Sequence, residues 1–172
     1  MKPVVAAAVA ILSLAAARPA AAALAVGEPA PDFSTQGAQG DAIMTVKLSD
    51  LLKDGPVVLY FFPSAFTEAA ESREFAENID KFRAAGANVV GMSRDSVETL
   101  ARFSADTCDG KFPMASASES IVNDFDVNDG AMFNTRTTYV IAPSGEIVFV
   151  YDNDDDSRHV RNALAFVEGM EK

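Results

Sequence analysis

Residues 57–67 read VVLYFFPSAFT, and this stretch decides the fold. The run from Val57 to Phe62 is entirely apolar, β-branched or aromatic, which is typical of a strand buried on both faces. Pro63 ends the strand because its ring fixes φ and removes a backbone donor. Thr67 is a residue type that caps helices, and it is predicted to open a helix that runs to about Ala85. The stretch therefore predicts a central strand followed closely by a helix.

The alternation of strand-like and helix-like segments continues on both sides of this stretch. Further strands are predicted at 88–93, 112–116, 137–142 and 146–151, with an irregular strand pair at 33–48; further helices are predicted at 49–53, 96–105, 119–125 and 157–170. This order predicts an α/β fold with a mixed central sheet flanked by helices on both faces. Val57–Phe62 is expected in a parallel centre, between Asn88–Ser93 and Thr137–Ala142.

Composition limits the classes of function. The chain has 172 residues, which fits one domain. It carries 14 Lys and Arg against 25 Asp and Glu, a formal charge of -11. This balance argues against a nucleic-acid partner and against docking on an anionic membrane surface. One cysteine, Cys108, excludes an internal disulfide, a CxxC redox pair and a thiolate-rich metal site.

The first 25 residues are typical of a cleavable export signal. Lys2 gives a positive start, an apolar run follows, and Ala21-Ala22-Ala23 and Ala23-Leu24-Ala25 both fit an A-x-A cleavage pattern. The apolar run is shorter than the roughly 20 residues that span a bilayer, so the mature form is expected to have no membrane anchor. Residues 26–172 are predicted to form the single domain. The protein is expected to be periplasmic or secreted, or to enter an organelle lumen if the source has plastids.

Three segments in register resemble the peroxiredoxins, the alkyl hydroperoxide reductase/thiol-specific antioxidant superfamily. They are residues 26–33 (VGEPAPDF), 57–67 (VVLYFFPSAFT), and 136–141 (RTTYVI) with the turn 143–145. The resemblance is nearest to the bacterioferritin-comigratory or Q type. It implies a thioredoxin-like fold, a monomer, no cofactor, and thiol-dependent reduction of hydrogen peroxide or organic hydroperoxides. The implied partners are the peroxide and a thiol reductant such as thioredoxin or glutathione.

The resemblance also implies which residues form the reactive pocket. The family pattern is Pro-x-x-x-Thr-x-x-Cys with a later Arg, and here Pro63, Thr67 and Arg136 match it. Ala70 stands where the peroxidatic cysteine is expected, and alanine cannot form a sulfenic acid. The peroxidase step is therefore expected to be lost. Two alternatives remain open on the same fold: a non-catalytic binding or regulatory protein, and a thiol carrier that acts through Cys108.

Cys108 resembles a resolving cysteine of some Q-type relatives. Because Asp106 and Asp109 lie beside it in the sequence, we expect a raised thiol pKa rather than an activated thiolate. An unreactive cysteine is the alternative interpretation.

The remaining charged residues have more ordinary interpretations. Arg136 enters an apolar strand and is expected to pair with Glu71 or Glu68 near the helix start, in place of a thiolate. His159 has no acid or nucleophile motif beside it and is predicted to be solvated. No metal is expected: the calcium-loop spacing that begins at Asp124 lacks the required Gly and Glu, and the acidic run 152–156 is interpreted as a solvated turn.

Overall fold

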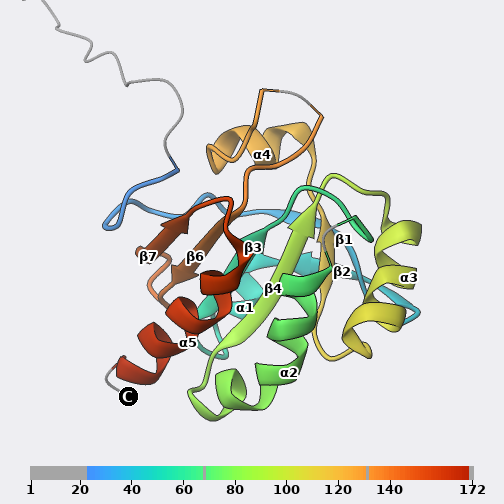
Figure 1. Ribbon diagram of the computed structural model, residues 1–172. Helices are drawn as coiled ribbons and strands as arrows, with labels where there is room; N and C mark the ends of the chain where they lie inside the picture. Colours follow the sequence, from blue (N-terminus) through green and yellow to red (C-terminus); the bar gives the residue numbers. More distant parts are fainter. Residues whose placement is uncertain (1–22, 68, 131, 171–172) are drawn as a thin grey trace, which may run out of the picture.

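The computed structural model describes residues 23–67, 69–130 and 132–170 (Figure 1). Seven strands alternate with helices along the chain. The strands are β1 (Ser34–Gln39), β2 (Ala42–Lys47), β3 (Val57–Phe61), β4 (Asn88–Ser93), β5 (Met114–Ser116), β6 (Thr137–Ile141) and β7 (Ile147–Asp152). The helices are α1 (Leu48–Leu51), α2 (Ala70–Ala84), α3 (Val97–Cys108), α4 (Glu119–Asp124), the 3-10 turn η1 (Asp156–Arg158) and α5 (His159–Gly169).

All seven strands form one mixed sheet in the order β2-β1-β5-β4-β3-β6-β7. The predicted neighbours of the central strand are confirmed, because β3 lies between β4 and β6. The expectation of a parallel centre holds on one side only. β3 runs parallel to β4 and antiparallel to β6. The reason is that β5 ends at the carboxyl end of the parallel strands and, after α4, the chain enters β6 at that same end, where Thr137 lies opposite Phe61. β6 therefore runs back along β3.

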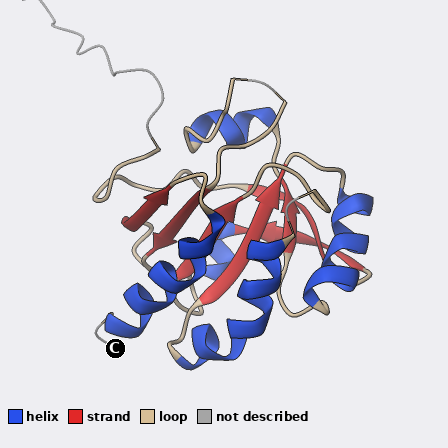
Figure 2. Ribbon diagram, viewed as in Figure 1, coloured by secondary structure: helices blue, strands red, loops and turns tan. Residues whose placement is uncertain are grey.

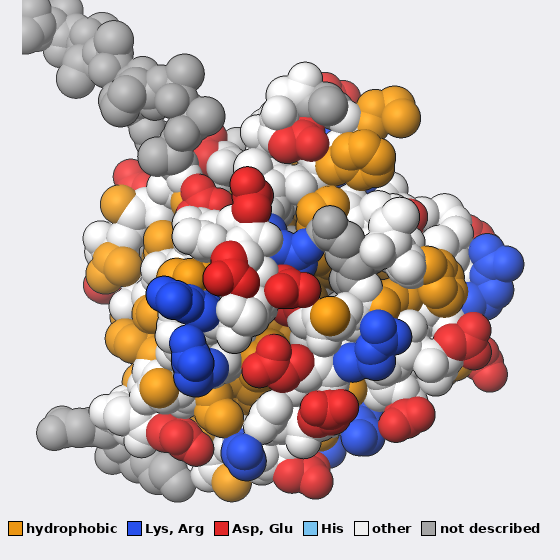
Figure 3. Space-filling model, viewed as in Figure 1, with side chains coloured by type: hydrophobic (Ala, Val, Ile, Leu, Met, Phe, Trp, Pro, Cys, Tyr) orange, Lys and Arg blue, Asp and Glu red, His pale blue; other side chains and the backbone are white. Residues whose placement is uncertain are grey.

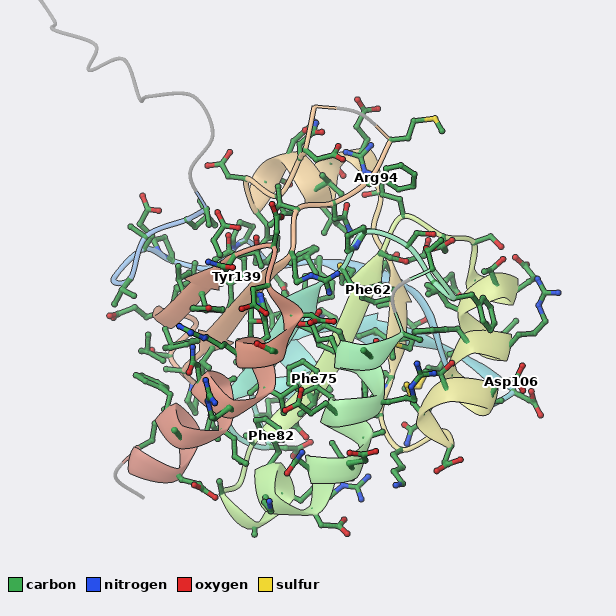
Figure 4. The ribbon with its side chains drawn as sticks, in the orientation of Figure 1. Phe62, Phe75, Phe82, Arg94, Asp106 and Tyr139 are labelled. Atoms are coloured by element: carbon green, nitrogen blue, oxygen red, sulfur yellow. The ribbon has the colours of Figure 1, made fainter. Side chains whose placement is uncertain are left out.

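Helices cover both faces of the sheet, as the sequence predicted (Figure 2). On one face α2, α3 and α5 pack over a core that includes Tyr60, Phe62 and Phe103. Phe75 and Phe82 lie on the side of α2 that faces the sheet (Figure 4). On the other face α1 and α4 cover a second cluster, which includes Leu59, Phe61 and Phe125. β3 contributes alternate residues to both clusters and is fully buried, which explains its continuous apolar sequence.

Several predicted boundaries shift. The pair at 33–48 is a regular two-stranded hairpin, β1 with β2, in continuous antiparallel register. The helix predicted at 96–105 continues to Cys108, where Asp109 ends it in the left-handed conformation with φ 51°. The last helix begins at His159, two residues later than predicted, because Asp155 caps the 3-10 turn η1 in front of it.

Residues 23 and 24, which precede the predicted domain, pack against the sheet. The Leu24 side chain is buried in the cluster beneath α4, and the Leu24 N–H donates to the hydroxyl of Tyr139 at 3.1 Å. The next residue, Ala25, donates its N–H to the Glu28 carboxylate at 2.8 Å. The predicted leader, residues 1–25, lies outside the described residues apart from 23–25.

Candidate functional site

The loop between β3 and α2 holds the pocket residues that the sequence singled out. It leaves the sheet at Phe62 and passes through Pro63, which is half-buried. The carboxylate of Asp95, just after β4, anchors this loop: it accepts the Ala65 N–H at 2.7 Å and the Ser93 hydroxyl at 2.7 Å. Asp95 thus ties the loop to the carboxyl end of the neighbouring strand.

The prediction that Thr67 caps the following helix is wrong. α2 begins at Ala70, and its N-cap is Ala69, which makes no side-chain cap. The Thr67 hydroxyl instead donates within the loop, to the Ser64 carbonyl at 3.2 Å and the Ala65 carbonyl at 3.4 Å. The preceding Phe66 has φ 65°, a backbone conformation that turns the chain before a helix can start. Thr67 is therefore an exposed loop residue that closes the loop on itself.

Ala70, the position that the resemblance gave to the missing cysteine, is the first residue of α2. Its side chain is exposed. The next residue, Glu71, points the other way and is buried, because neighbouring residues on a helix lie about 100° apart.

Glu71 and Arg136 form a buried ion pair at the start of α2, as predicted. Arg136 Nη1 donates to Glu71 Oε2, and the two residues are 4% and 1% exposed. Arg136 directly precedes β6, and the antiparallel pairing of β6 with β3 brings it to the pocket end of the sheet. The other predicted partner, Glu68, lies outside the described residues.

His159 is the third member of this cluster, and the prediction that it is solvated is wrong. Its ring is completely buried. Nε2 lies 2.8 Å from the Asn153 carbonyl, so it carries the proton, and Nδ1 then accepts from the Thr138 hydroxyl at 2.8 Å. Nδ1 lies 3.6 Å from Glu71 Oε1, and the edge of the ring contacts Tyr151 at a centroid distance of 4.7 Å. Among the described residues, Glu71 Oε1 has no hydrogen-bond partner.

Burial controls the protonation of this cluster. Desolvation raises the pKa of the Glu71 carboxyl to about 7, although Arg136 favours the charged form and opposes the shift. Desolvation also lowers the pKa of His159, against the hydrogen bond to Asn153. Both shifts favour the neutral forms, as expected for groups removed from water. The pocket therefore holds a neutral His159 imidazole beside a Glu71 carboxyl whose pKa is close to neutral pH.

Cys108 lies against the first turn of α2. It is the last residue of α3 and completely buried, and its Sγ is 3.7 Å from the Ser72 carbonyl. Burial raises the pKa of the thiol to about 12, and Asp109 adds to the shift. The predicted direction is therefore confirmed, with burial as the main cause. Asp106, the other acid that the sequence suggested, projects from α3 into solvent (Figure 4).

The acidic segments form turns. In the run 152–156 the Asp155 carboxylate accepts the Ser157 N–H at 3.0 Å at the start of η1. Within the described ranges no group of three or more His, Cys, Asp or Glu side chains is placed to hold a metal ion.

The same part of the chain contains no helix that is long and apolar enough to cross a membrane. Acidic and basic side chains are interspersed over α2 and α5, with apolar side chains between them (Figure 3).

The sequence analysis did not predict the roles of two site residues, His159 and Asp95. For His159 the sequence does contain a signal of burial. His159, Ala163 and Val167 recur every four residues, so the histidine continues the buried stripe of α5. Asp95 had a weaker signal, a polar residue directly beyond the end of a predicted parallel strand. Its target, the Ala65 N–H, lies 30 residues earlier and follows only from the pairing of β3 with β4.

Comparisons with known proteins agree with this architecture. The sequence model of the AhpC/TSA family matches residues 26–150. Peroxiredoxin Q, chloroplastic, of Sedum lineare is 28% identical over 153 residues, covering 84% of this chain and 78% of its own length. The protein of the same name from Oryza sativa subsp. japonica is 27% identical over 153 residues, covering 84% of this chain and 67% of its own.

A solved structure shows the same fold. The crystal structure of the peroxidoxin BcpB from Mycobacterium tuberculosis superposes with a TM-score of 0.77 at 28% sequence identity. The match covers 86% of this chain and 98% of that one. The thioredoxin-like, peroxiredoxin-type fold and the family predicted from three sequence segments are thus confirmed. The chain belongs to the AhpC/TSA family of antioxidant, peroxiredoxin-type proteins.

Proposed function

We propose that this chain keeps the peroxiredoxin fold and has lost the thiol-dependent peroxidase step. The family generally uses peroxide and a thiol reductant. Its reaction needs a thiolate at the start of α2, and residue 70 there is alanine, which offers no sulfur to oxidise. We infer a non-catalytic role in binding or regulation for the protein.

The observation that carries this proposal is the buried pair of Glu71 with Arg136. In a reactive pocket an Arg next to a helix start lowers a thiol pKa by stabilising the thiolate. Here the guanidinium already has an anionic partner, because the Glu71 carboxylate accepts its hydrogen bond. The positive charge of Arg136 is therefore engaged in a contact within the protein.

Cys108 does not replace the missing thiol. The thiolate is the nucleophile, and a buried thiol with a pKa near 12 contains very little thiolate at neutral pH. An incoming peroxide or disulfide would also need access to a side chain that has no exposed surface. These properties argue against the alternative in which the protein carries a thiol through Cys108.

Peroxide consumption by the parent chain and three variants tests the proposal. The chain as it stands should consume no hydrogen peroxide with dithiothreitol or thioredoxin as reductant. Ala70→Cys alone should gain little, because the Glu71 carboxylate beside the new thiol raises its pKa and still engages Arg136. Ala70→Cys with Glu71→Thr should be more active, since it removes the carboxylate and its ion pair with Arg136. Cys108→Ser is the control and should match the parent chain.

The outcomes separate the functional classes. Turnover by the parent chain that disappears in Cys108→Ser would establish a thiol enzyme at Cys108 and overturn the proposal. Turnover that survives in Cys108→Ser would also overturn it, because the chemistry would then need no cysteine. Absence of turnover in the parent, together with activity in the double variant, supports an intact pocket that lacks only its thiol.

We further propose that the protein is exported and that cleavage follows Ala23. Of the two A-x-A patterns, cleavage after Ala25 would remove Leu24, whose side chain is buried against the core. Cleavage after Ala23 keeps this contact and makes Leu24 the first residue. The mature N-terminus, measured by mass spectrometry after expression of the full chain in an exporting host, tests this. Cleavage after Ala25, or retention of residues 1–22, contradicts it.

A further inference from the structure

The outer edge of β2 is open. β2 is the end strand of the sheet, and within the described residues no other strand pairs with its outer side. Residues 42–45 are all exposed, and Ile43 and Met44 are large apolar side chains that are 55% and 38% exposed. The strand contains neither a proline nor a register shift, two devices that commonly protect such edges. Figure 1 shows the hairpin of β1 and β2 reaching beside α3.

The hairpin register fixes which backbone groups point outward. β1 and β2 are joined by a two-residue turn, and Gln39 lies opposite Ala42. At the other end of the hairpin, the Leu48 N–H donates to the Phe33 carbonyl, on the β1 side. Because backbone groups alternate along a strand, the even-numbered residues of β2 bond to β1. The N–H and C=O groups of Ile43, Thr45 and Lys47 therefore point away from the sheet.

A second copy of this chain fits the open edge. In an antiparallel pair related by a two-fold axis, outward-pointing residues must lie opposite one another, so odd-numbered residues pair with odd-numbered ones. Registers centred on Met44 and on Thr45 overlap equally, each pairing five of the six residues of β2. The one centred on Met44 places this residue opposite its own copy and Ile43 opposite Thr45. The same register places Asp41 opposite Lys47, twice. Both residues are exposed and of opposite charge, so the two ends of the strand are complementary to themselves.

We propose that two copies of this chain associate through β2, edge to edge and antiparallel, with Met44 on the two-fold axis. The pairing joins two seven-stranded sheets into one continuous sheet and covers Ile43 and Met44. It differs from the monomer that the family resemblance implied. The formal charge of -11 on each copy opposes association, and a single strand gives a small interface. The dimer is therefore concentration-dependent.

Sedimentation equilibrium over a concentration series tests the association. The parent chain at physiological salt should show a reversible monomer–dimer equilibrium. Asp41→Lys and Lys47→Asp should each weaken it at least tenfold, because each variant puts two like-charged pairs at the interface. The double variant Asp41→Lys/Lys47→Asp restores opposite charges and should recover most of the parent affinity. That recovery separates a specific register from a general effect of charge.

A substitution at Thr45 tests the backbone pairing. Thr45→Pro removes an outward N–H and places its ring where the second copy would bond, while the bonds to β1 come from even-numbered residues. Thr45→Val keeps the N–H and is the matched control. The proline variant should be monomeric, and the valine variant should dimerise like the parent. Circular dichroism and thermal melting show whether each variant is folded, and the charge variants keep the test decisive if the proline variant is not.

Engineered cysteines test the register. Met44→Cys should form an intermolecular disulfide on mild oxidation, because directly opposite residues of a non-hydrogen-bonded pair have Cα atoms about 4.5 Å apart. Ile43→Cys should not, because the two copies of residue 43 are offset along the strands beyond about 7 Å. The native Cys108 is buried and does not compete. A monomer at every concentration, a dimer unaffected by the β2 variants, or equal cross-linking at residues 43 and 44 would overturn the proposal.

Discussion

Arg136 and Glu71 form an ion pair that is almost fully removed from water, between the start of the sixth strand and the first turn of α2. A carboxylate in this position provides negative charge where the family reaction would need a thiolate. Buried pairs are costly to break because removing one partner leaves the other charge without its counter-ion. Removing the Glu71 carboxylate would therefore take an anionic partner from the buried Arg136 guanidinium.

Glu71→Ala should lower the free energy of unfolding by about 3 kcal/mol, near the lower end of the range for breaking a buried pair. The exposed Glu77 on the same helix provides the control, and Glu77→Ala should change stability by less than about 0.5 kcal/mol. Urea unfolding at pH 8, where Glu71 is mostly ionised, gives both values. Equal losses in the two variants would mean that the pair contributes nothing specific.

The stability of the chain should depend on pH through Glu71. The pKa of Glu71 is about 7 in the folded protein, against an ordinary value of 4.5 that applies to the unfolded chain. Between these two pH values the folded state holds the proton more tightly than the unfolded state does. The contribution of Glu71 is fully present below pH 4.5 and is lost as the pH rises through 7. The pKa of His159 is lowered in the folded protein, so this residue affects stability in the opposite direction. Its contribution to stability is lost as the pH falls below 6.5, the ordinary pKa of histidine.

Glu71→Gln separates these two effects. The variant removes the carboxyl titration, so the stability of the parent minus that of the variant should be larger at pH 5 than at pH 8. Urea midpoints at pH 5, 6, 7 and 8 provide the measurement. A difference that is larger at pH 8 would show that the folded-state pKa of Glu71 lies below its ordinary value.

Cys108 should react slowly in the native protein. A thiol that is fully buried and has a pKa near 12 should resist a disulfide reagent such as DTNB at pH 7.5 and should react at once in urea. Brief exposure to hydrogen peroxide should leave no sulfenic acid that a dimedone probe can trap. Rapid labelling of the folded chain by either reagent is the contrary result, and it would make Cys108 a reactive thiol.

Asp95→Ala should loosen the loop between β3 and α2. The substitution leaves the Ala65 N–H and the Ser93 hydroxyl without their acceptor, which should cost about 1–3 kcal/mol. Hydrogen exchange of residues 63–67 should become faster, while exchange in β3 itself changes little. The exposed Asp106 is the control, and Asp106→Ala should affect neither property. Unchanged exchange in the loop of the Asp95 variant would exclude an anchoring role.

The central strand could be predicted from the sequence because one physical requirement determines its residues. β3 contacts a core on both faces, so each position from Val57 to Phe61 is apolar. The short length, the β-branched and aromatic residues and the following Pro63 distinguish the run from a buried helix segment. The predicted pair of Arg136 with Glu71 followed from similar reasoning, since a charge that enters an apolar strand needs a partner.

The start of α2 and the hydrogen-bond partners of His159 could not be predicted from local sequence. Helix caps are predicted from side chains, and this helix begins at Ala70 with Ala69 as an N-cap that makes no side-chain bond, after a turn formed by the positive φ of Phe66. The spacing of His159 with Ala163 and Val167 indicates a buried position but does not identify its partners. Its buried partners, Thr138 and Asn153, come from the β6–β7 hairpin, and no local pattern reports such contacts.

Under the proposed cleavage after Ala23, the burial of Leu24 limits when that bond can be cut. A protease that cuts between Ala23 and Leu24 needs an extended stretch of chain on both sides of the bond. In the folded protein the Leu24 side chain is enclosed and its N–H is bonded to Tyr139, so the residues just after the bond are not available in that form. The proposed cut would therefore have to precede the completion of folding, or wait for this end of the chain to detach. On this proposal, the packing of Leu24 into the core would set the time at which the leader is removed.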